Sequence, residues 1–115
     1  NHMQSVAPVL QSTKLSENAK GNYLSKSLAK ELKRRGLTIE REKQLPVYYL
    51  EEKVGTCVPD FLVNNLIIVE LKAKPFLHDN DIQQFWHYLK NSTFKLGFLV
   101  NFGESDGVKI IRRVY

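Results

Sequence analysis

Residues 58–74, VPDFLVNNLIIVELKAK, contain two apolar runs separated by a pair of asparagines, a pattern that predicts a β-hairpin. Asp60 stands near the start of the first run, and Glu70 and Lys72 interrupt the second. A charged group inside a buried strand is costly unless it is paired or holds a metal. Because residues two apart in a strand project from the same face, Glu70 and Lys72 can converge on one point.

The three charged side chains of this stretch fit metal-assisted hydrolysis of a phosphodiester. The carboxylates of Asp60 and Glu70 are hard oxygen ligands that suit Mg²⁺ or Mn²⁺. The neighbouring Lys72 can orient or deprotonate a water molecule and stabilise the charge that develops on a phosphate. The alternative is a salt-bridged sheet surface that holds no metal.

The turn of this hairpin decides whether the two carboxylates share a face. A two-residue turn at Asn64-Asn65 pairs the residues that flank it and so places Asp60 on the face opposite Glu70. A three-residue connection, or a bulge beside Pro59, returns Asp60 to the face of Glu70. We therefore expect one of these two irregularities.

The chain has 115 residues, which predicts one domain with a single core. We assign residues 18–115 to this domain and interpret residues 1–17 as a tag remnant and a lead-in. No apolar run is long enough to cross a bilayer, and no charged-then-apolar leader precedes the domain. We therefore expect a soluble, intracellular protein, cytoplasmic or nuclear, without a membrane partner.

The cysteine count and the net charge narrow the function classes. One cysteine is too few for a disulfide framework, a four-cysteine zinc site or an iron–sulfur cluster in this sequence, and Cys57 is expected to be a buried apolar side chain. The formal charge of +5 favours a polyanionic partner such as nucleic acid.

Two segments have apolar residues at helical spacing. Residues 18–35 predict an amphipathic helix that ends at a glycine. The polar residues 78–81 suit the start of a second helix, whose apolar stripe runs through Phe85. Gln84 and Tyr88 lie four apart on a face rotated from that stripe, and we expect this face to be turned toward the carboxylates.

β-Branched and aromatic residues predict further strands over residues 45–50, 95–102 and 108–115. Residues 51–53, Glu-Glu-Lys, are expected to form the turn that leads into the hairpin. The predicted order is helix, three strands in meander order, helix, strand, strand. A helix between the third and fourth strands provides a crossover, so these strands are expected to run parallel in a mixed α/β sheet flanked by helices.

Seven segments occur in the chain in this order: LAKEL, REKQLPVYY, PDFLV, IIVELKA, QQFWHYLK, KLGFLVNFG and IIRRV. Together they resemble the GxxExxR proteins of the PD-(D/E)XK nuclease superfamily, from about residue 21 to the end of the chain. The spacing of Gln84 and Tyr88 is similar to the QxxxY element of RecB-type nucleases. The resemblance implies a restriction-endonuclease-like αβββαβ core, with Asp60, Glu70 and Lys72 at the catalytic positions and Gln84 in support.

The chain departs from the family at one carboxylate of the first helix. Its position falls near residues 20–22, Lys-Gly-Asn, and the nearest acidic residues are Glu17 and Glu31. The resemblance implies that this group commonly completes the metal site. Its absence favours an alternative, a non-cleaving nucleic-acid-binding or assembly module, unless Glu17 substitutes for it.

We predict a metal-dependent nuclease. Mg²⁺ or Mn²⁺ is held by Asp60, Glu70 and the backbone carbonyl of Leu71, Lys72 positions or activates the attacking water, and Gln84 and Tyr88 support the site. The expected partner is nucleic acid, DNA in preference to RNA, and a homodimer stays open. The candidate phosphate contacts, without base specificity, are Lys33, Arg34, Arg35, Lys74, Arg112 and Arg113.

Overall fold

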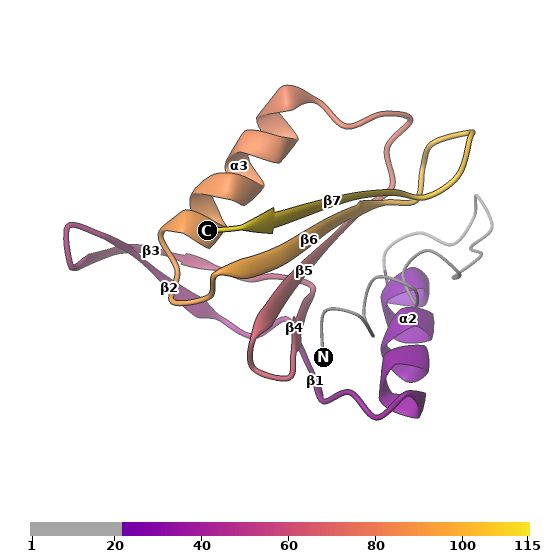
Figure 1. Cartoon of the computed structure of the whole chain (residues 1–115), viewed down its shortest axis with the longest axis horizontal. Helices are drawn as coiled ribbons and strands as arrows, with labels where there is room; N and C mark the ends of the chain where they lie inside the picture. Colours follow the sequence, from indigo (N-terminus) through magenta and orange to yellow (C-terminus); the bar gives the residue numbers. More distant parts are fainter. Residues whose placement is uncertain (1–21) are drawn as a thin grey trace.

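The computed structural model describes residues 22–115, with side chains from residue 25 onward. The predicted lead-in, the start of the predicted first helix and Glu17 lie outside this range. The helices are α2 (Asn22–Arg34) and α3 (Asp79–Lys90), and neither is long and apolar enough to cross a membrane. The strands are β1 (Ile39–Arg41), β2 (Leu45–Tyr49), β3 (Glu52–Cys57), β4 (Phe61–Val63), β5 (Ile67–Lys72), β6 (Leu96–Asn101) and β7 (Lys109–Val114) (Figure 1).

Five strands form a mixed sheet in the order β1-β4-β5-β6-β7. β4 pairs antiparallel with β1 and β5, β5 and β6 run parallel, and β6 and β7 are antiparallel. Helix α3 makes the crossover between the parallel strands, as the sequence predicts. Taken with its helices, this sheet has the predicted αβββαβ order plus a C-terminal strand, so the α/β class of restriction-endonuclease-like fold is confirmed.

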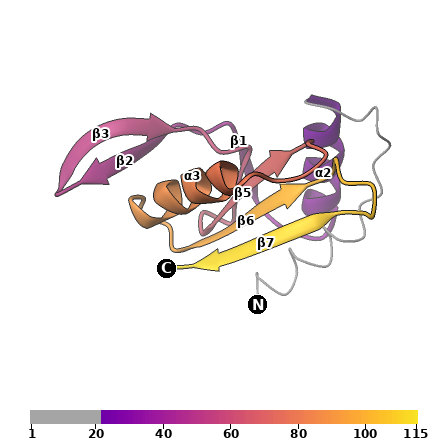
Figure 2. The same cartoon turned by 90° about the horizontal axis from the view of Figure 1, so that it is seen from above.

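Residues 45–57 differ from the prediction. The predicted turn at residues 51–53 is wrong, because β2 and β3 pair as a hairpin whose turn lies at Leu50 and Glu51, both with positive φ. The meander begins with the short β1 and not with residues 45–50, and the β2–β3 hairpin is a separate sheet that projects from the body (Figures 1 and 2). The three residues of β1, Ile-Glu-Arg, are all half-buried and contain no apolar run, so periodicity does not reveal them.

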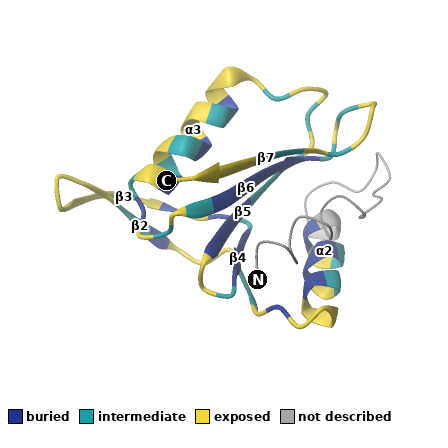
Figure 3. Cartoon of the chain, viewed as in Figure 1, coloured by how far each residue is buried: buried dark blue, intermediate teal, exposed yellow. Residues whose placement is uncertain are grey.

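The core has two parts, one on each face of the main sheet. Leu28 and Leu32 of α2 belong to a buried cluster with Phe98. On the opposite face, Phe85 and Leu89 of α3 belong to a second buried cluster with Ile68. Buried positions gather on β4, β5 and β6, as Figure 3 shows. Because strand side chains alternate, β5 is apolar on both faces until it reaches Glu70.

Cys57, at the end of β3, is buried with a free thiol, as expected. Burial is the main reason why the pKa of its thiol rises to about 11, and the charge of Glu70 adds to the shift. A thiol with this pKa stays protonated and unreactive near neutral pH.

Candidate active site

The turn of the β4–β5 hairpin has the irregularity that the sequence predicts. Asn64 and Asn65 have φ angles of 52° and 55°, the left-handed values that a type I′ turn requires. The N–H of Leu66 closes this turn by donating to the carbonyl of Val63 at 3.0 Å. The strand register nevertheless pairs Val63 with Ile67, so the connection has three residues and Leu66 is the extra one.

This register places Asp60 beside Glu70. The last pair of the ladder is Phe61 with Val69, and the next position outward joins the two carboxylates. The N–H of Asp60 donates to Oε1 of Glu70 at 3.2 Å, and Oδ2 of Asp60 accepts from the N–H of Leu71 at 2.7 Å. By strand alternation both side chains lie on the face that α3 covers.

Burial and mutual repulsion disfavour two negative charges at this point. The pKa of Glu70 rises to about 7, first because the group is buried and second because of the charge of Asp60. The pKa of Asp60 also rises, with burial as the main cause, while the hydrogen bond from Leu71 and the charge of Lys72 oppose the shift. A cation between the carboxylates would relieve both penalties.

Lys72 joins the two carboxylates at the end of β5. It lies two residues after Glu70 and therefore on the same face. Its charge lowers the pKa of Asp60, of Glu70 and of Asp81, which shows that the amino group is within electrostatic reach of all three. The structure thus brings together the three residues that the sequence places at the core of the site.

The backbone carbonyl of Leu71 lies on the side of the carboxylates. In a strand, the N–H and C=O of one residue point to the same side, and those of the next residue point to the other. The N–H of Leu71 points at Asp60, while the carbonyl of Lys72 accepts from the N–H of Phe102 at 2.9 Å on the opposite side. The Leu71 carbonyl can therefore serve as a third oxygen ligand.

Helix α3 turns Gln84 and Tyr88 toward the β4 and β5 side of the sheet. On one flank of its buried stripe, Trp86 contacts the ring of Tyr115, which follows the edge strand β7, with centroids 5.5 Å apart. Gln84 and Tyr88 occupy the other flank. Neither forms a hydrogen bond with Asp60, Glu70 or Lys72 in the described part of the chain, so their role at the site stays a prediction.

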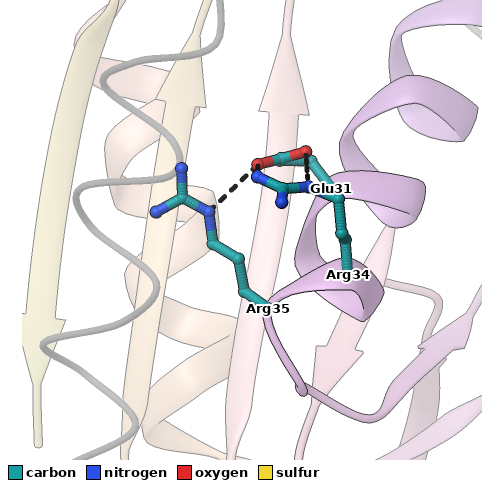
Figure 4. Close-up of polar contacts among 3 residues, drawn as sticks. All are labelled: Glu31, Arg34 and Arg35. Carbon is teal, nitrogen blue, oxygen red and sulfur yellow. Dashed lines mark hydrogen bonds and ion pairs between the residues drawn. The ribbon is translucent and has the colours of Figure 1, made fainter.

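The basic residues at the end of α2 lie far from the carboxylates. The chain leaves α2 and enters β1 beside the hairpin turn, where the N–H of Asn64 donates to the carbonyl of Thr38 at 2.8 Å. This turn is at the end of the sheet opposite Asp60. Arg34 and Arg35 both bind the carboxylate of Glu31, at 2.8 and 3.0 Å, and their hydrogen bonds lower its pKa to about 2 (Figure 4). Lys33 is exposed in the same turn of the helix.

The remaining basic candidates, two on β7 and one after β5, do not share one surface. Arg112 pairs with Phe98 across β6 and β7, and Arg113 pairs with Gly97, so the two arginines point to opposite faces of the sheet. Lys74 is close to the core of the site, and its Nζ binds Oδ1 of Asp81 at 2.6 Å.

Asn101 is a supporting residue that the sequence analysis does not single out. It is fully buried opposite Lys72 in the register of β5 and β6. Its Oδ1 accepts from the N–H groups of Lys74 and Gly103, at 2.9 and 3.3 Å, and its Nδ2 donates to the carbonyl of Lys74 and to Glu104, both at 2.9 Å. A Cβ at Gly103 would collide with the backbone of Lys74. These contacts hold the chain that follows Lys72, and a polar residue at the end of the apolar run GFLVN is the signal that could have indicated them.

We expect Asn101→Ala to lower the free energy of unfolding by about 2–4 kcal/mol, because it removes a fully buried side chain and leaves the half-buried N–H and C=O groups of Lys74 without partners. Urea unfolding measures the change. Asn80→Ala is the matched control, since Asn80 is exposed and its loss should change stability by less than about 0.5 kcal/mol. Equal effects of the two substitutions would contradict the assigned role.

Glu42 is a second neighbour of the site that the sequence does not reveal. Its N–H donates to the carbonyl of Asp60 at 3.3 Å, and its charge raises the pKa of Asp60. Even so, no group of three or more His, Cys, Asp or Glu side chains within residues 25–115 is arranged to hold a metal ion. The ligands that the described residues offer are two carboxylates and a backbone carbonyl.

The mixed sheet has a helical crossover between β5 and β6, and two carboxylates and a lysine lie together at one end of β4 and β5. Together these features define a nuclease-like α/β domain. A sequence model of the PD-(D/E)XK nuclease superfamily matches residues 12–114, and the chain belongs to this superfamily. The match begins within the predicted lead-in, and the GxxExxR and QxxxY assignments stay predictions. No curated protein and no solved structure was found to match the chain.

Proposed function

We propose that this protein is a metal-dependent nuclease that hydrolyses phosphodiester bonds, with DNA as the expected substrate. The proposal is carried by the half-buried pair of Asp60 and Glu70, which backbone hydrogen bonds hold side by side at the end of β4 and β5, in a member of a nuclease superfamily. Lys72 beside this pair supplies the group that hydrolysis needs next to a metal. Assignment to the GxxExxR proteins is part of the same proposal and rests on the seven ordered segments.

The oxygen donors of the site fit Mg²⁺ or Mn²⁺. Asp60, Glu70 and the carbonyl of Leu71 would hold the ion, and water molecules and the substrate phosphate would complete its coordination. When bound, the ion polarises a phosphate oxygen and stabilises the charge of the transition state. The two carboxylates contribute two negative charges, which matches the charge of the ion.

The other side chains act on the water and the phosphate. Lys72 orients the attacking water, accepts or redirects its proton, and offsets the negative charge that develops on the phosphate. Gln84 orients Lys72 or the phosphate from the flank of α3, with Tyr88 one turn along the same flank.

The second candidate is a nucleic-acid-binding or assembly module that has lost turnover. Two observations favour it: none of residues 20–22 is acidic, and among residues 25–115 no third side chain joins the two carboxylates as a ligand set. The retained Asp60, Glu70 and Lys72 favour the nuclease, because a buried charge without a role is costly to keep.

A cleavage panel separates the two candidates. Single-stranded, duplex and branched DNA and RNA are each incubated with Mg²⁺, Mn²⁺ or EDTA. The nuclease cleaves at least one substrate with metal and none with EDTA, and Asp60→Asn abolishes the cleavage. Glu52→Gln, at an exposed position of β3, is the control that should keep it. Cleavage that survives Asp60→Asn at the parental level would indicate a contaminating enzyme, and absence of cleavage on every substrate supports the binding module.

Metal affinity should rise with pH through about 7. Glu70 must lose its proton to act as a ligand, and its pKa of about 7 places this loss near neutral pH. Calorimetric titration with Mn²⁺ below and above this pH measures the effect, together with proton release in buffers of different ionisation enthalpy. An affinity that stays constant across this range would show that Glu70 is already ionised or is not a ligand.

A further inference from the structure

The loop of residues 73–78, which joins β5 to α3, presents an exposed aromatic ring shortly after Lys72. Phe76 is 58 % exposed, and its ring meets that of His78 edge to face with centroids 4.6 Å apart. Single exposed apolar side chains are common on protein surfaces, so exposure alone assigns no role. The case for a role of this ring depends on the contacts that hold its loop.

The loop is anchored on both sides of Phe76. Before it, both backbone groups of Lys74 bind the buried Asn101, and the Lys74 ammonium binds Asp81. After it, Leu77 packs against the cluster on the α3 face, and the N–H of His78 donates to Oδ2 of Asp81 at 3.0 Å. In Figure 1 this loop lies beside the loop between β6 and β7. Because these contacts already hold the loop, it loses little further conformational freedom when Phe76 binds a ligand.

The charged groups around Phe76 leave no cation to bind a phosphate, so a contact of this ring with nucleic acid would be made to a base. The ammonium of Lys74 is paired with Asp81, whose pKa it lowers. Asp79 and Glu104 add negative charge on either side of the loop. A phosphate therefore finds no unpaired cation on this loop, whereas the face of a nucleobase is uncharged and stacks on aromatic rings.

The ring is within reach of a nucleotide that flanks the reaction centre. Four residues of chain span at most about 14 Å, so the Cα atom of Phe76 lies within this distance of the Cα atom of Lys72. A base inside a duplex is covered on both faces by its neighbours and cannot stack on a protein ring unless it is extruded.

We propose that Phe76, supported by His78, is a stacking site for an unpaired nucleobase, and that the substrate is single-stranded or locally unpaired nucleic acid. The proposal rests on the proposed function, because that function gives the position of the phosphate. The anchored loop then holds one unstacked base while the adjoining phosphate lies at Asp60, Glu70 and Lys72.

The test is the affinity for a short oligothymidylate, measured by fluorescence anisotropy in EDTA so that no strand is cut. Phe76→Ala is expected to weaken binding about tenfold or more, and Phe76→Tyr, which keeps the ring, to stay within about twofold. Tyr49→Ala is the matched control, since Tyr49 is 63 % exposed on the distant β2–β3 hairpin. The salt dependence of binding should be the same for Phe76→Ala as for the parent, because no phosphate contact is lost.

Each other outcome overturns the stacking site: no loss in Phe76→Ala, an equal loss in Tyr49→Ala, a Phe76→Tyr protein as weak as Phe76→Ala, or a reduced salt dependence. Thermal unfolding of every variant excludes misfolding, which is not expected at exposed positions. Cleavage with Mg²⁺ is scored separately. A parent that binds through Phe76 but cuts nothing refutes the nuclease and keeps the stacking site. If the Phe76→Ala protein cuts single strands as fast as the parent at limiting substrate, the stacking site is refuted and the nuclease proposal stands.

Discussion

Lys72→Ala is expected to lower metal-dependent cleavage by about 10²- to 10⁴-fold while substrate affinity stays near that of the parent. Lys72 acts on the water and on the charge of the transition state, and the loss of one phosphate-neutralising group costs little binding. The fold should tolerate the change, because the Lys72 side chain forms no hydrogen bond or ion pair with another described residue. Single-turnover rates and equilibrium binding, measured on the same substrate, separate the two quantities.

Lys53→Ala provides the control for a general effect of removing positive charge. Lys53 is exposed on β3, and its removal should leave the cleavage rate unchanged. If Lys72→Ala instead weakens binding as much as it slows cleavage at saturating substrate, Lys72 is a binding group. Full activity of Lys72→Ala would remove it from the mechanism.

Glu70→Gln is expected to stabilise the metal-free protein above pH 7, by on the order of 3 kcal/mol, and to abolish stabilisation by Mn²⁺. The pKa of Glu70 is about 7 in the folded protein against an ordinary value of 4.5. The stability that this group contributes is therefore fully present below pH 4.5 and is lost as the pH rises through about 7. Glutamine mimics the neutral form at every pH, and its oxygen can still accept the N–H of Asp60.

Urea unfolding in EDTA, followed across this pH range, measures the effect. The parent should lose stability between pH 4.5 and 7 relative to Glu70→Gln, whereas the exposed Glu52→Gln should follow the parent. Added Mn²⁺ should raise the unfolding midpoint of the parent and leave Glu70→Gln unchanged, because only the parent has both carboxylate ligands. A Glu70→Gln protein that is less stable than the parent above pH 7 would contradict the assigned burial penalty.

Local signals were sufficient for the elements that carry the site. Charges inside the apolar run of β5 indicate Glu70 and Lys72, and the period of two in a strand puts them on one face. The requirement that Asp60 share this face predicts either a three-residue connection or a bulge beside Pro59, and the register shows the first of these. The polar residues before α3 predict its start, and a helix between two apolar strands predicts their parallel pairing.

The misplaced elements depend on contacts between distant residues. Residues 45–50 have a stronger strand pattern than Ile39–Arg41, yet β1 joins the main sheet because Ile39 packs against the α2-face cluster beside β4. The charged residues 51–53 suit a turn by composition, but the pairing of Tyr49 with Glu52 moves the turn to Leu50 and Glu51. Local composition does not encode which strand finds which partner.

The sequence by itself determined the class of fold through the order of its helices and strands, and it predicted the hairpin and the three core residues of the candidate site, because burying a charge is costly and strand side chains alternate with a period of two. Only the tertiary structure decided that Asn101 holds the backbone after Lys72, that Glu42 reaches Asp60, and that the basic residues of α2 lie at the far end of the sheet. These relations join segments separated by many residues, and they arise from packing and hydrogen bonding that no local pattern records.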